Sequence, residues 1–412
     1  MTDCPSGQSM SRRALIVGGG IGGLSAAIAL VLRGWEVRVL ERAPELTEVG
    51  AGLQISPNGA KVLRALGVLE ALQPVLFEPE SVDLRLGYSG RRVFSIPMRR
   101  IARERWGAGY FQVHRADLVE ALRARLEEMQ PGAISLGRAI TGYLQADREI
   151  AALADGVEVG SADLLIGADG IRSVVREQML GAEHPRFTGN VAWRAVVPVE
   201  RLGVEAPPPS GTIWAGSKRH AVTTYLRAGS LVNFVGIVEQ SGWNEEGWHH
   251  SGDPQAALAA FEGWHPTVRR ILSEAETIHR WALFDRPPLA RWSDGRTVLL
   301  GDACHPMLPS MAQGAVQALE DAWVLAEHLE RDPDPTVAAN AYFEARIARV
   351  TAIQKRSAAN SRLFHLPNAV MRTVAYLPLG VADRVFPSVL HGLQDRIYGH
   401  DVTAGSDLSI DR

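Results

Sequence analysis

The chain has 412 residues, of which 46% are hydrophobic, and a formal net charge of -3 at pH 7. That length can bury a large core in roughly two or three domains, and the small net charge gives no reason to expect a nucleic acid or an anionic membrane as a partner. The 2 cysteines exclude a disulfide framework and lack metal-ligand spacing, and the N-terminus lacks the apolar run of a signal peptide, so we expect a cytoplasmic protein without a metal.

A glycine-rich turn between a predicted strand and a predicted helix is the first motif. The apolar run Ala14–Val17 is typical of a buried strand, and apolar side chains recur at helical spacing after the glycines. Gly18 permits a tight turn, Gly20 lets the backbone approach a pyrophosphate, and Gly23 lets the helix pack close to the strand. The N-terminus of such a helix presents free N–H groups to phosphates.

The following segment predicts the second half of the same unit. A strand is expected over Glu36–Leu40, and Glu41 comes after it, about 20 residues beyond the glycines, where a carboxylate that binds a ribose belongs. A surface turn is the alternative for the glycines by themselves. Strand, glycines, helix, strand and acid together favour a dinucleotide-binding site.

The next stretch predicts a loop and further elements. Gly50, Ala51 and Gly52 indicate a loop whose backbone lies against something flat or bulky. We expect a helix over about 59–67, a hairpin of a second, antiparallel sheet over 81–96, and a helix from 111 to about 128. Arg115, near the start of the last helix, is by itself typical of a solvated surface charge.

A second motif combines a buried strand, an acid and a helix start. The apolar strand Asp163–Gly167 runs into Asp169-Gly170, where short side chains allow a close backbone approach. Asp169 stands at the start of the next helix and can cap it. Capping alone would be a sufficient role for this residue.

A third motif has the same order. The buried strand Arg296–Leu300 runs into Gly301-Asp302, and a long helix follows over about 316–329. A carboxylate at the end of such a strand can accept a hydrogen bond from a sugar hydroxyl, and the turn before the helix offers N–H groups to negative charge. The remainder is predicted to be helical, and its longest apolar window, 373–382, is too short to span a bilayer.

Residues 190–238, between the second and third motifs, predict a mostly antiparallel sheet with one face against the first domain. In the strand Arg219–Leu226 the side chains alternate between faces, so His220 and Thr224 share one face and Tyr225 lies on the other. A histidine here is a candidate base near neutral pH. The alternative is a histidine at a sheet edge in contact with solvent.

With these three motifs in this order, nearly the whole chain resembles the single-component, FAD-dependent aromatic hydroxylases with the para-hydroxybenzoate hydroxylase fold. It is most similar to the branch that contains salicylate hydroxylase, 3-hydroxybenzoate 6-hydroxylase and 6-hydroxynicotinate 3-monooxygenase. The resemblance implies an α/β fold with a Rossmann-like FAD-binding domain (a parallel sheet with helices), a mostly antiparallel β-sheet substrate domain and a C-terminal helical segment. We expect the FAD-binding domain to be discontinuous and to span 10–80, 100–185 and 285–345. The substrate domain is expected over 81–99 and 186–284, and the C-terminal helical segment over 346–400.

The resemblance also implies roles for individual residues. Non-covalently bound FAD is expected to contact Gly18, Gly20, Gly22, Gly23, Glu41, Arg42, Gly52, Arg115, Asp169, Gly301, Asp302, Gln313, Gly314 and Ala315. The substrate is expected beside Gln54, Thr224, Pro309 and Ser310, with His220 as the catalytic residue. The related branch often has an aromatic residue or a histidine at the position of Ser310 and a tyrosine at that of Thr224, so the identity of the substrate stays open.

The implied activity is that of a monooxygenase. NAD(P)H, as a transient co-substrate, reduces the flavin, and O2 then gives a C4a-hydroperoxide that hydroxylates a small aromatic, hydroxybenzoate- or hydroxypyridine-like. An epoxidase or N-hydroxylase of a non-phenolic substrate, a dehydrogenase and a flavin-binding sensor stay open as alternatives. We expect a monomer or homodimer, with neither nucleic acid nor membrane as partner.

Overall fold

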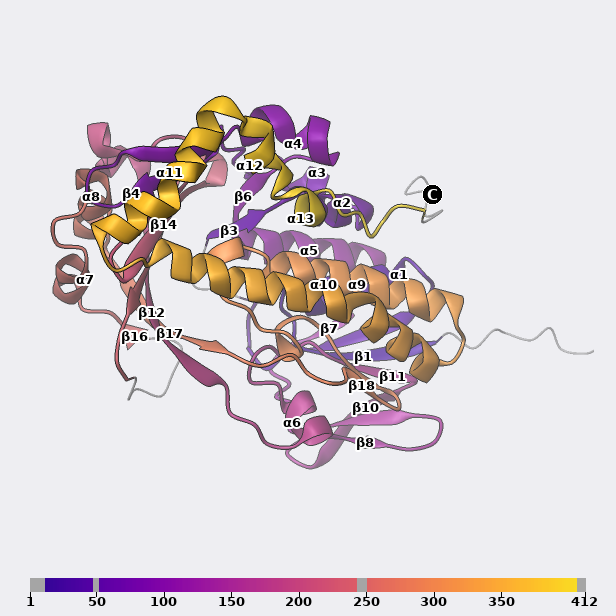
Figure 1. Cartoon of the computed structure of the whole chain (residues 1–412). Coiled ribbons are helices and arrows are strands. Elements are labelled where there is room, and N and C mark those ends of the chain that lie inside the picture. The colour runs from indigo at the N-terminus through magenta and orange to yellow at the C-terminus, as the bar shows by residue number, and fades with distance from the viewer. Residues whose placement is uncertain (1–11, 47–51, 243–249, 406–412) are drawn as a thin grey trace, which may run out of the picture.

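The computed structural model describes residues 12–46, 52–242 and 250–405. Within them an α/β fold combines a parallel sheet, a large antiparallel sheet and a set of C-terminal helices (Figure 1). This is the fold class predicted from the sequence. Gly50 and Ala51 of the predicted flat loop lie outside the described residues. None of the helices within these ranges is long and apolar enough to cross a membrane.

Six strands form a mostly parallel sheet in the described part of the chain. Its strands, in spatial order, are β18 (Ser293–Asp294), β19 (Thr297–Leu299), β11 (Leu164–Gly167), β1 (Arg13–Val17), β2 (Glu36–Leu40) and β7 (Ile134–Ser135). The residues from Ala14 to Val17 are at most 5% exposed, as expected for a strand that is covered on both faces.

The register of this sheet places the three sequence motifs side by side. β1 pairs in parallel with β11, which pairs in parallel with β19, so Val17 lies beside Gly167 and Gly167 beside Leu299. Each motif follows one of these strand ends. The carboxyl ends of neighbouring parallel strands meet at one edge, which is where open α/β sheets bind ligands.

Helices cover one face of the parallel sheet and a small sheet covers the other (Figure 1). The helices are α1 (Ile21–Val31), α5 (Arg115–Met129), α9 (Gly314–Arg331) and α10 (Pro335–Phe364), and α1 packs against both α5 and α9. The small sheet consists of β8 (Gly142–Gln145), β9 (Ile150–Ala154) and β10 (Val157–Ala162), with α6 (Val174–Leu180) beside β8. Ala26 and Ala27 are almost fully buried, and such small side chains let the neighbouring elements approach α1 closely.

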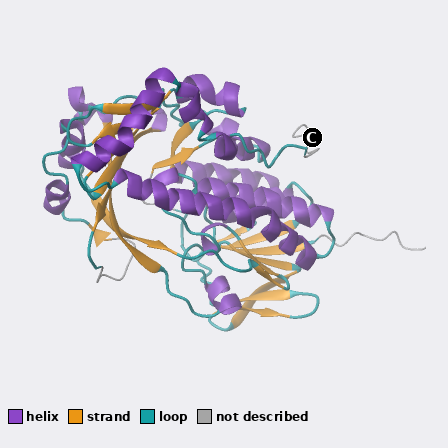
Figure 2. Ribbon diagram, in the orientation of Figure 1, coloured by secondary structure: helices purple, strands orange, loops and turns teal. Residues whose placement is uncertain are grey.

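An eight-stranded, largely antiparallel sheet is the second large sheet of the described residues (orange strands at the left of Figure 2). Its strands, in spatial order, are β16 (His250–Ser251), β17 (Ile278–Asp285), β12 (Arg186–Pro198), β15 (Leu231–Glu239), β14 (Arg219–Leu226), β13 (Gly211–Gly216), β4 (Val82–Leu86) and β5 (Arg92–Ile96). The predicted hairpin over 81–96 is confirmed as β4 and β5. A ribbon of β3 (Gly52–Ile55) and β6 (Phe111–His114) contacts β14, and helices α7 (Pro254–Ala260) and α8 (Pro266–Glu274) pack beside this sheet.

The remaining helices are α2 (Pro57–Ala65), α3 (Leu69–Leu72), α4 (Met98–Trp106), α11 (Ala369–Val385), α12 (Pro387–Gly392) and α13 (Asp395–Tyr398). The helix predicted over 59–67 begins two residues earlier, because Pro57 takes its first position. The proposed boundary between 345 and 346 falls inside α10, which is continuous from Pro335 to Phe364.

A buried ionic network joins α9 to α10. Arg346 donates from Nη1 to Glu320 Oε2 (2.6 Å) and from Nε to Asp321 Oδ1 (2.8 Å), and these three side chains are at most 2% exposed. Glu320 also accepts hydrogen bonds from Arg349 (2.8 Å) and from Asn58 of α2 (2.6 Å). Burial raises the pKa of Glu320, but Arg346 and Arg349 outweigh this and lower it to about 2.

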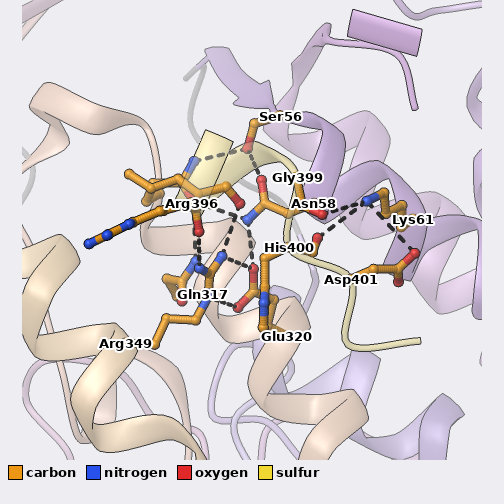
Figure 3. Close-up of polar contacts among 12 residues, drawn as sticks. Ser56, Asn58, Lys61, Gln317, Glu320, Arg349, Arg396, Gly399, His400 and Asp401 are labelled. Atoms are coloured by element: carbon orange, nitrogen blue, oxygen red, sulfur yellow. Dashed lines mark hydrogen bonds and ion pairs between the residues drawn. The ribbon is translucent and has the colours of Figure 1, made fainter. Parts of the chain in front are cut away.

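The same network reaches the C-terminal segment (Figure 3). Arg349 donates to the carbonyl oxygen of Arg396 (2.8 Å), and Lys61 of α2 donates to those of Gly399 (3.2 Å) and His400 (3.4 Å). These contacts hold the chain after α13 against α2 and α10.

We expect Arg346→Ala to lower the free energy of unfolding by about 3–5 kcal/mol, because it leaves two carboxylates buried without their main cation. Urea titration measures this change. Arg331→Ala is the matched control, since it breaks an ion pair of a largely exposed arginine with Glu327 and should cost less than about 1 kcal/mol. Equal effects of the two substitutions would contradict a stabilising role for the network.

The network also predicts a pH dependence in the wild type. The unfolded chain takes up a proton on Glu320 near its ordinary pKa of 4.5, whereas the folded chain does so only near 2. The contribution of Glu320 to stability is therefore complete above pH 4.5 and is lost as the pH falls toward 2.

Candidate active site

The loop between β1 and α1 requires glycine for two different reasons. Gly18 has a φ of +107°, and a Cβ added there would lie 2.5 Å from a carbonyl oxygen of the neighbouring loop. A Cβ added at Gly23 would lie 1.9 Å from the carbonyl oxygen of Gly18. At Gly20, by contrast, no atom lies within 4 Å of an added Cβ. The first two positions are constrained by packing, whereas the open side of Gly20 faces free space.

That free space belongs to a cleft made of two adjoining cavities. The first cavity is lined by residues that include Gly18, Glu41, Arg42 and Asp169. The second is lined by residues that include Gly22, Gly52, Gly301, Asp302, Gly314 and Ala315. Gly20, Arg115, Ala168 and Gly170 line both. The cleft therefore extends along the carboxyl edge of the parallel sheet, as an elongated dinucleotide requires.

Two predicted cofactor residues do not line the cleft. Gly23 packs under the glycine loop, and Gln313 has a buried side chain that donates to Ser56 Oγ (2.9 Å). Gly314 and Ala315, which do line it, open α9. The first N–H groups of a helix have no acceptor within it and carry the positive end of its dipole, so this end favours a polar or anionic group.

Glu41 shapes the first cavity as well as lining it. Its Oε2 accepts a hydrogen bond from the N–H of Gly19 (2.6 Å), and its Oε1 accepts one from the N–H of Ala43 (2.9 Å). A carboxylate offers about four lone-pair sites, so it retains acceptor capacity for the hydroxyls of a ribose.

Asp169 has one oxygen in use and one without a partner. Oδ2 accepts from the N–H groups of Val174 (2.7 Å) and Val175 (3.2 Å), the first two of α6, so Asp169 binds the helix start as predicted while Ser173 is its N-cap residue. Oδ1 is buried and has no hydrogen-bond partner among the described residues. Burial raises the pKa of this carboxyl group. An unpartnered oxygen beside the cleft fits a ligand that donates a hydrogen bond.

Asp302 opens onto the second cavity. The protein around it raises its pKa by desolvation, while His305 and Arg115 act in the opposite direction. The loop that carries it is held from below, because Asp321 Oδ2 accepts from the N–H of Gly301 (3.2 Å) and lies 2.5 Å from His305 Nε2. The open side of Gly20, the free oxygen of Asp169 and the N-terminus of α9 together fit the pyrophosphate, ribose and ring edge of FAD.

The predicted substrate residues line the second cavity or the cavity next to it. Gln54, Thr224 and Pro309 line the second cavity, and Ser310 lines a third cavity that shares Gln54 and Pro309 with it. Gln54 accepts a hydrogen bond from the hydroxyl of Tyr110 (2.5 Å). These residues therefore surround one continuous space next to the cofactor cleft.

His220 lies on the face of β14 that the alternation predicts. His220 and Thr224 line the second cavity, whereas Tyr225 stacks on Phe77 with ring centroids 4.9 Å apart. The alternative of a solvent-exposed histidine at a sheet edge is wrong, because β14 is an interior strand and His220 is 0% exposed. Its Nδ1 lies 2.6 Å from His365 Nε2, and its Nε2 has no partner among the described residues.

Arg194, in the wall of the second cavity, and His365, in contact with His220, were not among the predicted site residues. Arg194 of β12 lines the second cavity, stacks over Trp281 at 4.1 Å, and has an Nε without a hydrogen-bond partner among the described residues. Burial and then Arg115 lower its pKa to about 10, so it is a cation at neutral pH. A charge in an otherwise apolar strand was a usable signal for it, whereas nothing in the sequence pointed to His365.

Comparison with known proteins gives consistent matches over most of the chain. Residues 12–357 match the family described as FAD binding domain. The chain is 36% identical over 375 residues to the 3-amino-4-hydroxybenzoate 2-monooxygenase PtmB3 of Streptomyces platensis. This match covers 90% of this chain and 93% of that protein. It is 38% identical over 357 residues to the 3-hydroxybenzoate 6-hydroxylase 1 of Aquipseudomonas alcaligenes, with 84% and 88% covered. The crystal structure of Klebsiella pneumoniae HpxO complexed with FAD and uric acid matches with a TM-score of 0.82 and 27% identity, over 94% of this chain and 97% of that one.

These matches agree with the residues that line the cleft. The matching family region contains the three strand-end motifs, and the glycine loop, Glu41, Asp169, Asp302 and the N-terminus of α9 line the cleft that fits FAD. The resemblance seen in the sequence is confirmed: the chain belongs to the FAD-dependent aromatic hydroxylases, a family of flavoprotein monooxygenases.

Proposed function

We propose that this FAD-dependent monooxygenase uses NAD(P)H and O2 to hydroxylate a small phenolic ring that carries a carboxylate, such as a hydroxybenzoate. The observation that carries the proposal is the composition of the second cavity. A neutral histidine nitrogen and an arginine line the same space as Asp302 and the N-terminus of α9. The two hydroxylases compared above are named for hydroxybenzoate substrates, which have both a phenol and a carboxylate.

FAD, when bound, supplies the redox chemistry and the activation of oxygen. The residues of the chain bind FAD, orient the substrate and remove its phenolic proton. The glycine loop and Glu41 hold the pyrophosphate and adenosine end, while Asp302 and the first turn of α9 hold the ribityl and ring end. The walls of the cavity exclude water from the reacting ring.

His220 is the group best placed to activate the ring. A phenol is a stronger nucleophile as the phenolate, so a base that accepts the phenolic proton favours transfer of oxygen to the ring. Burial, and then the neighbouring His365, hold the pKa of His220 well below its ordinary value. The ring is therefore neutral at pH 7 and its Nε2 can accept a proton.

Arg194 is the candidate anchor for the carboxylate. Arg194 lines the cavity, and its Nε is buried and lacks a partner among the described residues. A planar guanidinium matches a carboxylate in bidentate geometry. An arginine and a base in the wall of the same cavity would fix the ring in one orientation.

A dehydrogenase, or an epoxidase or N-hydroxylase of a non-phenolic substrate, would use the same cofactor cleft. Stoichiometry separates these activities, since a hydroxylase consumes NAD(P)H and O2 together, a dehydrogenase needs no O2 and a sensor turns over neither. The base in the cavity favours a substrate with an acidic proton, because an alkene has no such proton to remove.

The cofactor prediction contrasts two glycine substitutions. Gly20→Val should leave the protein folded but colourless, because its side chain has room in the protein and occupies the space of the pyrophosphate. Gly23→Ala should instead impair folding, because its Cβ would overlap the carbonyl oxygen of Gly18. Flavin absorbance and thermal unfolding of the purified proteins measure the two effects. Recovery of NAD rather than FAD from denatured wild type would overturn the assignment.

The substrate prediction compares rings with and without a carboxylate. On a panel of hydroxybenzoates, hydroxypyridines and the matching hydroxybenzamides, we expect the acids to stimulate NAD(P)H oxidation coupled to O2. Arg194→Gln should raise KM for the best acid about 10- to 150-fold, the loss expected for a hydrogen bond to a charged group, and should change little for its amide. A weaker affinity for FAD with an unchanged KM would make Arg194 a cofactor ligand instead.

The base prediction concerns His220→Ala. Binding of FAD and anaerobic reduction of the flavin should stay close to wild type, while product formation falls by about 10²- to 10⁴-fold and reducing equivalents are released as H2O2. Raising the pH should partly restore product, because the phenol then ionises in solution. His184→Ala, at an exposed histidine, is the control. Wild-type coupling in His220→Ala would leave the histidine without a catalytic role.

A further inference from the structure

A chain of three side chains leads from the substrate cavity to the surface. His220 on β14 lies with Nδ1 2.6 Å from Nε2 of His365, and Nδ1 of His365 lies 3.1 Å from Oε1 of Glu239. His365 follows the last residue of α10, and Glu239 is the last residue of β15. Figure 1 shows this end of α10 reaching the large sheet.

The hydrogen-bond directions in this chain follow from its outer end. A carboxylate can only accept, so His365 donates its Nδ1–H to Glu239. Nε2 of neutral His365 is then an acceptor, and His220 must donate its Nδ1–H to it. The remaining nitrogen, Nε2 of His220, carries a lone pair and no proton. Glu239 thereby sets the tautomer of a histidine that it does not touch.

The two ends of the chain open onto different spaces. His220 lines the second and third cavities, beside the cofactor cleft. His365 and Glu239 line a separate pocket at the surface, the outer pocket, together with Lys218, Gln240, Ser361 and Arg362. The side chain of Glu239 is 43% exposed, whereas that of His365 is 5% exposed. The chain therefore connects a buried lone pair with solvent.

We propose that His220, His365 and Glu239 form a proton relay that carries the phenolic proton of the substrate to the surface pocket. The phenol O–H bond breaks and its proton binds Nε2 of His220. The Nδ1 proton of His220 moves to Nε2 of His365, and the Nδ1 proton of His365 moves to Glu239 or to water in the pocket. One proton enters the relay and one leaves it, so both histidines are again neutral but carry their protons on Nε2. The reverse transfer, which returns a proton from the pocket to the oxygen of the product ring, restores the Nδ1 tautomers.

A relay solves a difficulty that a single buried histidine would have. Burial, and then the proximity of His365, make a charged His220 unfavourable, so a proton held there would return to the substrate. His365 is also buried, and that lowers its pKa, but Glu239 opposes this effect. Arg219 lowers it further, and Lys218 and Arg362 at the outer pocket have the same sign of charge. Glu239 is the anion that makes transient protonation of His365 possible.

This inference rests on the proposed function, since it assumes that the ring in the cavity has an acidic hydroxyl. His365 and Glu239 are positioning and relay residues, because neither lines the substrate cavity. Its tests therefore include one that needs no substrate.

The first test is ¹⁵N NMR of the histidines in the FAD-loaded protein. We expect His220 and His365 to be neutral at pH 7 with their protons on Nδ1. Glu239→Gln should populate the other tautomer of His220, because an amide can also donate to His365. A proton on Nε2 of His220 in the wild type would overturn the relay whatever the substrate is.

The second test measures proton release with phenol red in weak buffer when 3-hydroxybenzoate, or the best acid of the panel, binds to the FAD-loaded protein. His365→Gln keeps an acceptor for the Nδ1–H of His220 but cannot pass a proton on. We expect it to slow proton release and product formation about 10²- to 10⁴-fold, the range for lost acid–base catalysis. His365→Ala should be slowed equally and be restored in part by added imidazole. Ser361→Ala, in the wall of the same outer pocket, should behave as wild type.

The outcomes separate this inference from the proposed function. Wild-type proton release in His365→Gln, with product formation still dependent on His220, would overturn the relay and leave the hydroxylase intact. No product from any aromatic acid, with the expected tautomers in the NMR experiment, would overturn the proposed substrate class and leave the hydrogen-bond chain in place. Failure of imidazole to restore His365→Ala while His365→Gln is active would reduce His365 to a structural support.

Discussion

The carboxylate of Asp321 is the contact on which the candidate site depends. It accepts from Arg346 Nε (2.8 Å) and from the N–H of Gly301 (3.2 Å), and it lies 2.5 Å from His305 Nε2. Burial lowers the pKa of His305, but Cys304 and Asp321 outweigh it and raise that pKa well above its ordinary value. One buried charge thus joins α9, α10 and the loop after β19. A buried charge is tolerated only when its partners satisfy it, and here the same partners position the loop that opens onto the cofactor cleft.

The parallel sheet and α10 extend that local constraint to the whole active site. The register of β1, β11 and β19 brings together three loops that are far apart in the sequence. α10 carries Arg346 near its middle and is followed by His365, about 28 Å away along the helix at about 1.5 Å per residue. The single helix α10 therefore connects Arg346, which binds Asp321 beside the Gly301-Asp302 loop, to His365, which contacts His220.

The parts of the fold that could be predicted have local signals. The three motifs combine glycines with strand and helix periods within short windows, and the face of β14 that carries His220 follows from a period of two residues. The parts that could not be predicted depend on distant partners. His365 is 145 residues from His220, and no pattern in either segment pairs them. The helix α10 runs through residue 345 without a helix-breaking residue there, so no local signal in the sequence marks a boundary at that position.

The charges of the second cavity indicate which species the site holds. Arg115 and Arg194 line it as cations, Asp302 is the acid that lines it, and His220 is neutral. Burial, and then the neighbouring Arg115, lower the pKa of Arg194 to about 10, and the Arg115 part of this effect is a repulsion between two cations of the same cavity. An anionic ring relieves that repulsion, whereas a proton retained on His220 would increase it. If the substrate is the proposed phenolic acid, the two cations would stabilise its phenolate, and the proposed relay would remove the phenolic proton from the cavity.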